Sequence, residues 1–425
     1  MLNRYNPPDF QILQHVHVPR VQSHTLTNGI KLHWLNAGEQ PIVRIELIFK
    51  AGNWYESQRN VSYFTIKMMN EGTTRMTARQ INEYIDQFGA FLEFNHGQDK
   101  SSITLYTITK HLEKLLPVLK DIVTGSTFPE KELQNIKNIS IQNLKVNQEK
   151  TAYLAQTRFR ELLFGKDHPY GKNMYEEDIL RIEPEALKQF YLERITSQPF
   201  DIVAAGEVSE QTLALLRHTF EDIVVRGISL NGKEYSQAPI SIKEDIVEKS
   251  ESLQSTLRMG RKLFTRSHPD YIKMLVLNEI LGGYFGSRLM RNIREEKGFT
   301  YGISSNLVTL QQLGYFVIGT DVKREFTSLT IEEVYKEMQI LRTELVEEEE
   351  LEVVKNYMAG SFAGSLSTPF TLADHFKAIY FDGLTYDFYD NYIENILNTS
   401  ARQLQELANQ YLTDESMLVV IAGGK

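Results

Sequence analysis

Residues 187–206 read LKQFYLERITSQPFDIVAAG, and residues 404–423 read LQELANQYLTDESMLVVIAG. In both stretches a helical pattern is followed by a short loop and a strand pattern that ends at a glycine. FPEKELQNIKN around Lys137 is likewise matched by VEEEELEVVKN around Lys355, about half a chain later. Self-similarity at so long a period predicts two related domains rather than a solenoid.

Signals around these repeats predict an α+β fold. HTLTNGIKLHWLNAG (24–38) is typical of a hairpin, because Asn28-Gly29 favours a tight turn between two strands. Thr77 is suited to cap the helix that Ala78, Ile81, Ile85 and Phe88 predict by their spacing. We therefore expect two homologous domains, residues 1–228 and 245–425, each a mixed or antiparallel sheet with helices on one face. Residues 229–244 are polar and carry Gly and Pro, which predicts a linker.

Composition excludes several classes of protein. The 425 residues exceed the roughly 250–300 that one hydrophobic core serves. A net charge of −9 argues against a nucleic-acid partner, because phosphate binding needs clustered Lys and Arg. The chain has no Cys, which excludes disulfides, thiolate metal sites and Cys nucleophiles. We find neither a signal-peptide pattern nor an apolar run of membrane-spanning length, so the default expectation is a cytoplasmic protein without membrane contact.

The order and spacing of six motifs resemble the insulinase/pitrilysin/mitochondrial processing peptidase family of inverzincin-type metallopeptidases. These motifs are AGNWYES (51–57), NEGT (70–73), INEYIDQFGA (81–90), HPYGKNMYEEDILRIEPEALKQFY (168–191), DIVAAGEV (201–208) and LMRNIREEKGFTYGISS (289–305). The resemblance covers nearly the whole chain. It implies a clamshell of two homologous domains and a family activity as zinc metalloendopeptidases.

The zinc motif of that family is replaced in this chain. Active members carry H-x-x-E-H on the first helix, with two imidazole ligands and a Glu as general base, and a third ligand some 75–80 residues later. The corresponding positions hold Tyr63, Ile66 and Lys67, and the third-ligand position falls at Asn143, 76 residues after Lys67. Ile cannot move a proton, and the Lys ammonium repels Zn²⁺. We expect no metal or other cofactor in this chain.

The ten His offer no substitute zinc site. The spacings H-x-x-E-H, H-E-x-x-H and H-x-x-x-H are all absent from the sequence. We interpret His96, in FNHGQDK, and His168, in HPYG, as structural residues. The acidic run at residues 347–350 is interpreted as the solvated start of a helix, where acidic side chains are favoured.

Two residues of the second half keep a chemical role by resemblance. Small two-chain or self-paired family members carry an Arg and a Tyr in the segment that matches RLMRNIREEKGFTYGISS (288–305), and these correspond to Arg294 and Tyr301. A guanidinium and a phenol hydroxyl are suitable donors to the oxyanion that forms when a peptide carbonyl is attacked. The alternative interpretation is structural: Arg294 would pair with Glu295 or Glu296, and Tyr301 would be a half-buried strand residue.

The resemblance implies a partner. The leading hypothesis is a non-zinc subunit that pairs with a homologous zinc-bearing H-x-x-E-H chain and supplies Arg294 and Tyr301 for hydrolysis of peptides. The chain alone is then inactive. Whether it forms a homodimer without that partner stays open. The second hypothesis is a structural scaffold with no peptidase role, as in some family members of a respiratory complex. A third, a self-paired enzyme with a displaced metal site, has no compact His/Glu motif to support it.

Overall fold

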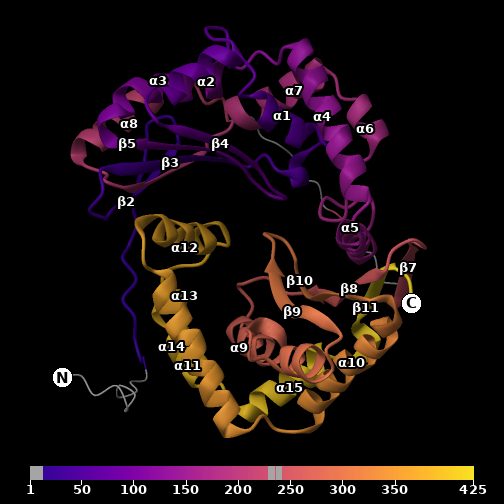
Figure 1. Cartoon of the computed structure of the whole chain (residues 1–425). Coiled ribbons are helices and arrows are strands. Elements are labelled where there is room, and N and C mark those ends of the chain that lie inside the picture. Colours follow the sequence, from indigo (N-terminus) through magenta and orange to yellow (C-terminus); the bar gives the residue numbers. More distant parts are fainter. Residues whose placement is uncertain (1–12, 228–234, 236–241) are drawn as a thin grey trace, which may run out of the picture.

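The computed structural model describes residues 13–227, 235 and 242–425, and these build two sheets that face each other across the molecule (Figure 1). Most of the predicted linker lies outside the described residues, so the predicted domain bounds stay predictions. The strands of the first sheet, in spatial order, are β1 (Gln22–Thr25), β2 (Lys31–Asn36), β6 (Asp201–Gly206), β3 (Ile42–Phe49), β5 (Ser101–Ile108) and β4 (Phe91–His96). Those of the second are β7 (Glu244–Glu248), β11 (Leu418–Gly423), β8 (Gln254–Leu263), β10 (Gly314–Lys323) and β9 (Thr300–Thr309).

Apart from β1, an additional strand at one edge of the first sheet, the two sheets follow the same strand order. One parallel pair occurs in each, β2 with β6 and β7 with β11, and all other neighbours are antiparallel. The repeated stretches quoted above end in β6 and β11, which hold equivalent places in the two orders. The predicted α+β class with two homologous, mixed sheets is therefore confirmed.

The helices lie mainly on the outer faces of the two sheets (Figure 1). Those of the first half are α1 (Val61–Met68), α2 (Ala78–Asp86), α3 (Leu112–Gly125), α4 (Glu130–Gln148), α5 (Thr151–Phe164), α6 (Glu176–Leu180), α7 (Pro184–Tyr191) and α8 (Glu210–Phe220). Those of the second half are α9 (Tyr271–Asn278), α10 (Thr327–Thr343), α11 (Glu348–Ser365), α12 (Pro369–Phe381), α13 (Asp387–Asp390), α14 (Tyr392–Leu397) and α15 (Ala401–Tyr411). Within the described ranges, every helix is too short or too polar to cross a membrane.

The halves exchange one helix each, which the sequence did not predict. Helix α5 of the first half packs on β8 and β11 of the second sheet, and α12 of the second half packs on β2 and β6 of the first sheet. Phe159 of α5 and Ala373 of α12 are fully buried in these contacts. The expectation of helices on one sheet face was thus wrong, because the inner face of each sheet is also apolar and is covered from the opposite half.

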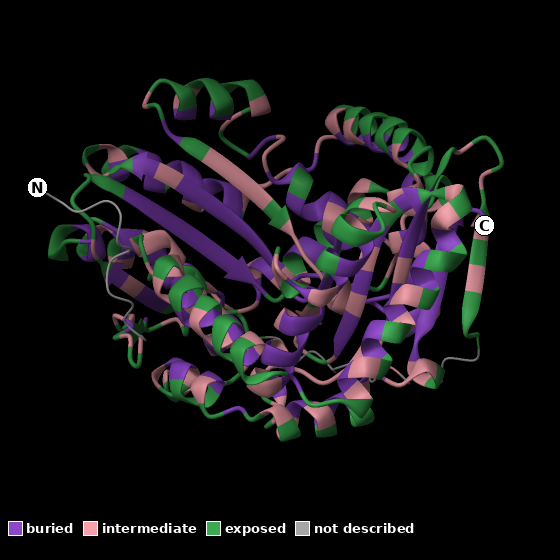
Figure 2. Cartoon of the chain, turned by 60° about the horizontal axis from the view of Figure 1, so that its bottom comes forward, coloured by how far each residue is buried: buried purple, intermediate pink, exposed green. Residues whose placement is uncertain are grey.

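Each half has its own apolar core, and the strands are buried between helices (Figure 2). The lysines of the sequence repeat have equivalent roles at the edges of these cores. The Nζ atom of Lys137 on α4 donates to the carbonyl oxygen of Leu180 at 3.1 Å. The Nζ atom of Lys355 on α11 donates to that of Leu397 at 2.8 Å. Both acceptors are the last residues of short helices, so each ammonium satisfies a free carbonyl at a helix C-terminus.

Polar contacts hold the halves together on the inner side. Arg44 of β3 donates to Asp374 of α12 at 2.8 and 3.2 Å, a two-pronged ion pair between the halves. Tyr170 donates to the carboxylate of Asp99 at 2.6 Å, and the backbone NH of Gln311, in the β9–β10 turn, donates to the same carboxylate at 3.1 Å. Paired or buried polar groups at both places fix how the two halves pack against each other.

Candidate functional site

The helix that carries the replaced zinc motif is α1. Ile66, at the position of the general base, is 1% exposed and packs into the first-half core. Tyr63 is half-buried, and its ring lies edge-on to the His96 ring with centroids 5.7 Å apart. Lys67 is exposed at the end of the same helix. Of the three motif positions on α1, Ile66 is therefore buried in the core, whereas Tyr63 is half-buried and Lys67 is exposed.

The four positions together do not fit zinc. Asn143, at the third-ligand position, is exposed on α4, which contacts α1. A phenol, an aliphatic chain, an ammonium and an amide provide neither the imidazole nor the carboxylate ligands that zinc takes in proteins. In the part of the chain that the structure describes, no three His, Asp or Glu side chains cluster so as to hold a metal ion.

A buried polar chain fixes the start of α1 beside these positions. Ser62 donates to the carboxylate of Glu56 at 2.9 Å, and its oxygen also lies 2.9 Å from Nε2 of His96. Burial raises the pKa of Glu56, although Lys172, 3.3 Å away, favours its charged form. Burial, and to a smaller extent the charge of Lys67, lowers the pKa of His96 to about 4. His96 is therefore a neutral, hydrogen-bonded structural residue at neutral pH.

Ser62, His96 and Glu56 do not form a nucleophilic triad. In a triad the imidazole stands between the hydroxyl and the acid, whereas here the Ser62 hydroxyl stands between the other two. Ser62 is also 1% exposed, so its oxygen is closed to a substrate. His168 is structural as well, since its Nδ1 accepts the backbone NH of Tyr170 at 3.1 Å.

Arg294 and Tyr301 lie at the surface of the second half. Arg294 is on a wide helical turn, η5 (Met290–Glu296), and its guanidinium lies 4.7 Å from the ring centre of Phe285. It makes no ion pair with Glu295 or Glu296, or with any other acid of the described residues. Tyr301, near the start of edge strand β9, is 94% exposed. Both structural alternatives for these residues are therefore wrong: within the described ranges the guanidinium contacts a ring and no acid, and the Tyr301 phenol makes no hydrogen bond.

The structure does not bring these two residues into contact with α1. Among the described residues, no hydrogen bond, ion pair or ring contact links Arg294 or Tyr301 to Tyr63, Lys67 or Asn143. An exposed phenol and a half-buried guanidinium that have no polar partner among the described residues are suited to act on a group outside the chain. The structure therefore has two features: replaced metal positions on α1 and α4, and two donors of the second half without a polar partner among the described residues.

Two family models cover most of the chain. The "Insulinase (Peptidase family M16)" model matches residues 34–168, which include α1 and α4. The "Peptidase M16 inactive domain" model matches residues 181–358, which include Arg294 and Tyr301. The chain belongs to peptidase family M16. The resemblance seen in the six motifs is thereby confirmed, and the inactive-domain match runs from α7 of the first half to α11 of the second.

Relatives of this M16 chain differ in what their names say of activity. It is 25% identical over 410 residues to the "Uncharacterized zinc protease YmxG" of Bacillus subtilis (strain 168), a match that covers 95% of this chain and 98% of the relative. It is 21% identical over 395 residues to the "Non-peptidase homolog YmxG" of Helicobacter pylori (strain ATCC 700392 / 26695), covering 91% and 90%. The crystal structure of a peptidase M16 inactive domain from Pseudomonas fluorescens shares the fold, with a TM-score of 0.86 at 24% identity, and covers 96% of this chain and 99% of that chain.

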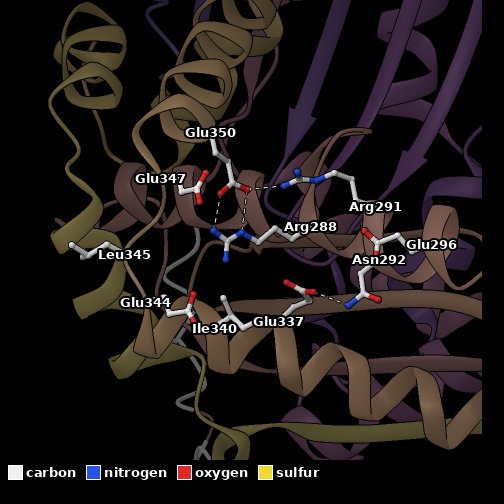
Figure 3. Close-up of a pocket in the computed structure, with 10 residues that line it drawn as sticks. All are labelled: Arg288, Arg291, Asn292, Glu296, Glu337, Ile340, Glu344, Leu345, Glu347 and Glu350. Atoms are coloured by element: carbon white, nitrogen blue, oxygen red, sulfur yellow. Dashed lines mark hydrogen bonds and ion pairs between the residues drawn. The ribbon is translucent and has the colours of Figure 1, made fainter.

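Sequence reasoning missed a polar cavity in the second half of this M16 chain (Figure 3). It measures 370 Å³ and is lined by Arg288, Arg291, Asn292, Glu296, Glu337, Ile340, Glu344, Leu345, Glu347 and Glu350. Arg288 binds Glu350 through two hydrogen bonds of 3.0 and 2.7 Å, and Arg291 binds the same carboxylate at 3.0 Å. Glu350 is thus paired, whereas the whole run at 347–350 was expected to be solvated. The sequence did hold a hint of this cluster. Arg288 and Arg291 are three residues apart, a spacing that places two side chains on one face of a helix.

Proposed function

We propose that this chain is the metal-free subunit of a two-chain peptidase and supplies Arg294 and Tyr301 to a homologous partner that binds zinc. The observation that carries the proposal is the exposure of Tyr301, 94%, together with the absence of any acidic partner for Arg294 among the described residues. Neither the Tyr301 phenol nor the Arg294 guanidinium has a polar partner among the described residues, so both are donors without an internal task. Their natural acceptor is the oxyanion of a peptide bond under attack.

The replaced positions on α1 and α4 support the same proposal from the other side. Ile66 is core, and Lys67 would repel a divalent cation. Hydrolysis by this chain therefore needs zinc and a general base from elsewhere. The partner supplies both, and this chain supplies binding surface and oxyanion stabilisation.

The decisive experiment rebuilds the pair. The tagged chain is purified from its native cells, the co-purifying protein is identified, and hydrolysis of a quenched unfolded peptide is measured for each chain and for the pair. We expect activity only in the pair and its loss on chelation. Arg294→Ala and Tyr301→Phe should each lower kcat of the pair by about 10²- to 10³-fold, the usual effect of removing one oxyanion donor. Binding of the two subunits should not change.

Matched controls come from the same half of the chain. Arg402→Ala removes an exposed guanidinium of α15, and Tyr357→Phe removes a half-exposed phenol hydroxyl of α11. Both should leave kcat of the pair unchanged. Equal turnover of the Arg294, Tyr301 and control variants would contradict the proposal, as would a partner without H-x-x-E-H.

A structural subunit with no peptidase role is the second candidate. It is favoured by the burial of Ile66 in the first-half core and by the buried Glu56–Ser62–His96 hydrogen bonds, which give α1 a structural role. The same experiment separates the two. The structural role is supported if the complex needs this chain to assemble but its kcat is unchanged by Arg294→Ala and Tyr301→Phe.

A further inference from the structure

The polar cavity of Figure 3 has more carboxylates than cations in its wall. Five Glu against two Arg give the lining a formal charge of −3. Both guanidiniums are bound to the same carboxylate, that of Glu350. The other four carboxylates have no ion pair within the part of the chain that the structure describes. A concave surface lined mainly by one sign of charge concentrates ions of the opposite sign.

The floor of the cavity consists of buried hydrogen-bond acceptors. Glu337 of α10 is 9% exposed, and its carboxylate accepts from Nδ2 of Asn292 at 2.7 Å. Asn292 is 8% exposed, and its Oδ1 atom has no hydrogen-bond partner among the described residues. A buried acceptor without a donor is costly, so a donor from outside the chain would be stabilised here.

The electrostatic potential in the cavity is negative. Burial opposes the charge of Arg288, yet its hydrogen bonds with Glu350 and the charges of Glu350, Glu337 and Glu344 raise the pKa of the guanidinium. The carboxylates that surround Arg288 therefore outweigh the cost of its burial. A second cation that entered the cavity would be favoured by the same charges.

The spacing of the carboxylates suits separate charges on one ligand. Glu344, at the end of α10, follows Glu337 by seven residues, which is about 10 Å along a helix. Ile340 lies between them on the same face of α10, and Leu345 beside it is 58% exposed. Two anionic positions are thus joined by an apolar surface that methylene groups can cover.

The same spacing argues against a metal ion. Within the described ranges, no three His, Asp or Glu side chains converge closely enough to hold one. A divalent cation such as Ca²⁺ needs several oxygen ligands around a single point. A ligand whose positive charges are spread along a chain does not.

We propose that this cavity binds a linear alkyl polyamine. One ammonium would donate to Glu337 and to Oδ1 of Asn292, the methylene groups would cover Ile340 and Leu345, and a second ammonium would reach Glu344. The proposal goes beyond the proposed function and does not depend on it, because Arg294 and Tyr301 do not line the cavity and no zinc-bearing partner takes part in binding.

Isothermal titration calorimetry of the full chain tests the proposal, with spermidine and n-butylamine as the two probes. We expect one spermidine per chain, bound about 10- to 100-fold more tightly than n-butylamine, the range for one more hydrogen bond between charged groups. Glu337→Gln should lower the affinity for both amines by about 10-fold or more. Glu344→Gln should lower the affinity for spermidine to a similar extent and leave that for n-butylamine unchanged.

Controls distinguish this site from general attraction by acidic residues. Glu332→Gln changes an exposed carboxylate on the opposite face of α10 and should alter neither affinity. The unfolding midpoint of Glu337→Gln shows whether that variant is folded, and Glu344→Gln repeats the test at an exposed position.

Four results would overturn the proposal. The first two are no binding of spermidine, and equal binding of spermidine and n-butylamine. The third is displacement of spermidine by an equal concentration of Mg²⁺, because the site would then be an unspecific acidic surface. The fourth is binding of Nα-acetyl-lysine amide as tight as that of spermidine, because the ligand would then be the side chain of a peptide.

Discussion

The first half and the second half share one strand plan but differ in where their reactive side chains lie. In the first half, the positions that hold metal and base in active relatives are a core Ile66, an exposed Lys67 and an exposed Asn143. In the second half, Tyr301 is exposed and Arg294 is half-buried against the Phe285 ring, and neither has a polar partner among the described residues. Each half has its own core, so one can lose its catalytic groups without cost to the fold of the other. The comparison shows that fold and chemistry are separable here.

The largest expected effect tests whether the base position has truly become core. Ile66→Glu should lower the free energy of unfolding by about 3 kcal/mol or more, because it buries an unpaired carboxylate. Lys67→Glu, one residue further on the same helix but exposed, should change it by less than about 0.5 kcal/mol. Urea unfolding of both variants provides the measurement. If Ile66→Glu were as stable as Lys67→Glu, the position would be open to the surface.

A smaller effect tests the equivalence of the two halves. Lys137→Met and Lys355→Met each remove an ammonium from the carbonyl oxygen at a helix C-terminus. We expect each to cost about 1 to 2 kcal/mol of unfolding free energy, and the double variant to cost the sum. Lys131→Met, at an exposed position near the start of α4, is the control and should be neutral. If one of the two variants lost unfolding free energy and the other did not, the two lysines would not have equivalent roles.

The smallest effect concerns His96. Its pKa falls from the ordinary 6.5 to about 4 in the folded protein, so between these values the unfolded chain binds more protons. Stability is then fully present above pH 6.5 and decreases as the pH falls toward 4. From about pH 7.5 to about pH 6 the loss from this group is about 0.8 kcal/mol. Unfolding of wild type and His96→Gln at both pH values measures it, and His168, whose pKa is also lowered to about 4, contributes equally to both proteins. An identical pH slope in the variant would argue against a buried neutral His96.

Much of the fold could be predicted from the sequence because it depends on local signals. Asn28-Gly29 forms the predicted turn between β1 and β2, and Thr77 caps α2 by accepting the backbone NH of Gln80. The repeats around Lys137 and Lys355 predicted two equivalent halves, and their equal hydrogen bonds show why those residues recur. Replacement of the metal ligands could also be read directly, because ligand chemistry depends on residue type at fixed spacing.

What could not be predicted depends on contacts between distant segments. The amphipathic pattern of α5 or α12 says that an apolar face must be covered, but not that the sheet of the other half covers it. The pairing of Glu350 with Arg288, and the contact of Lys100 with the Phe381 ring, follow from that three-dimensional arrangement. The exposure of Tyr301 was missed for a related reason: alternation along β9 gives the face of a residue, but not whether anything covers that face.

We propose that helix α1 holds no metal and that hydrolysis therefore needs a second chain. The most direct measurement is elemental analysis of the chain purified from zinc-supplemented cells, combined with a peptidase assay of the same sample. We predict zinc far below one ion per chain and no hydrolysis. One zinc per chain that is lost on substitution of Tyr63 or Asn143, with hydrolysis that a chelator abolishes, would contradict the account.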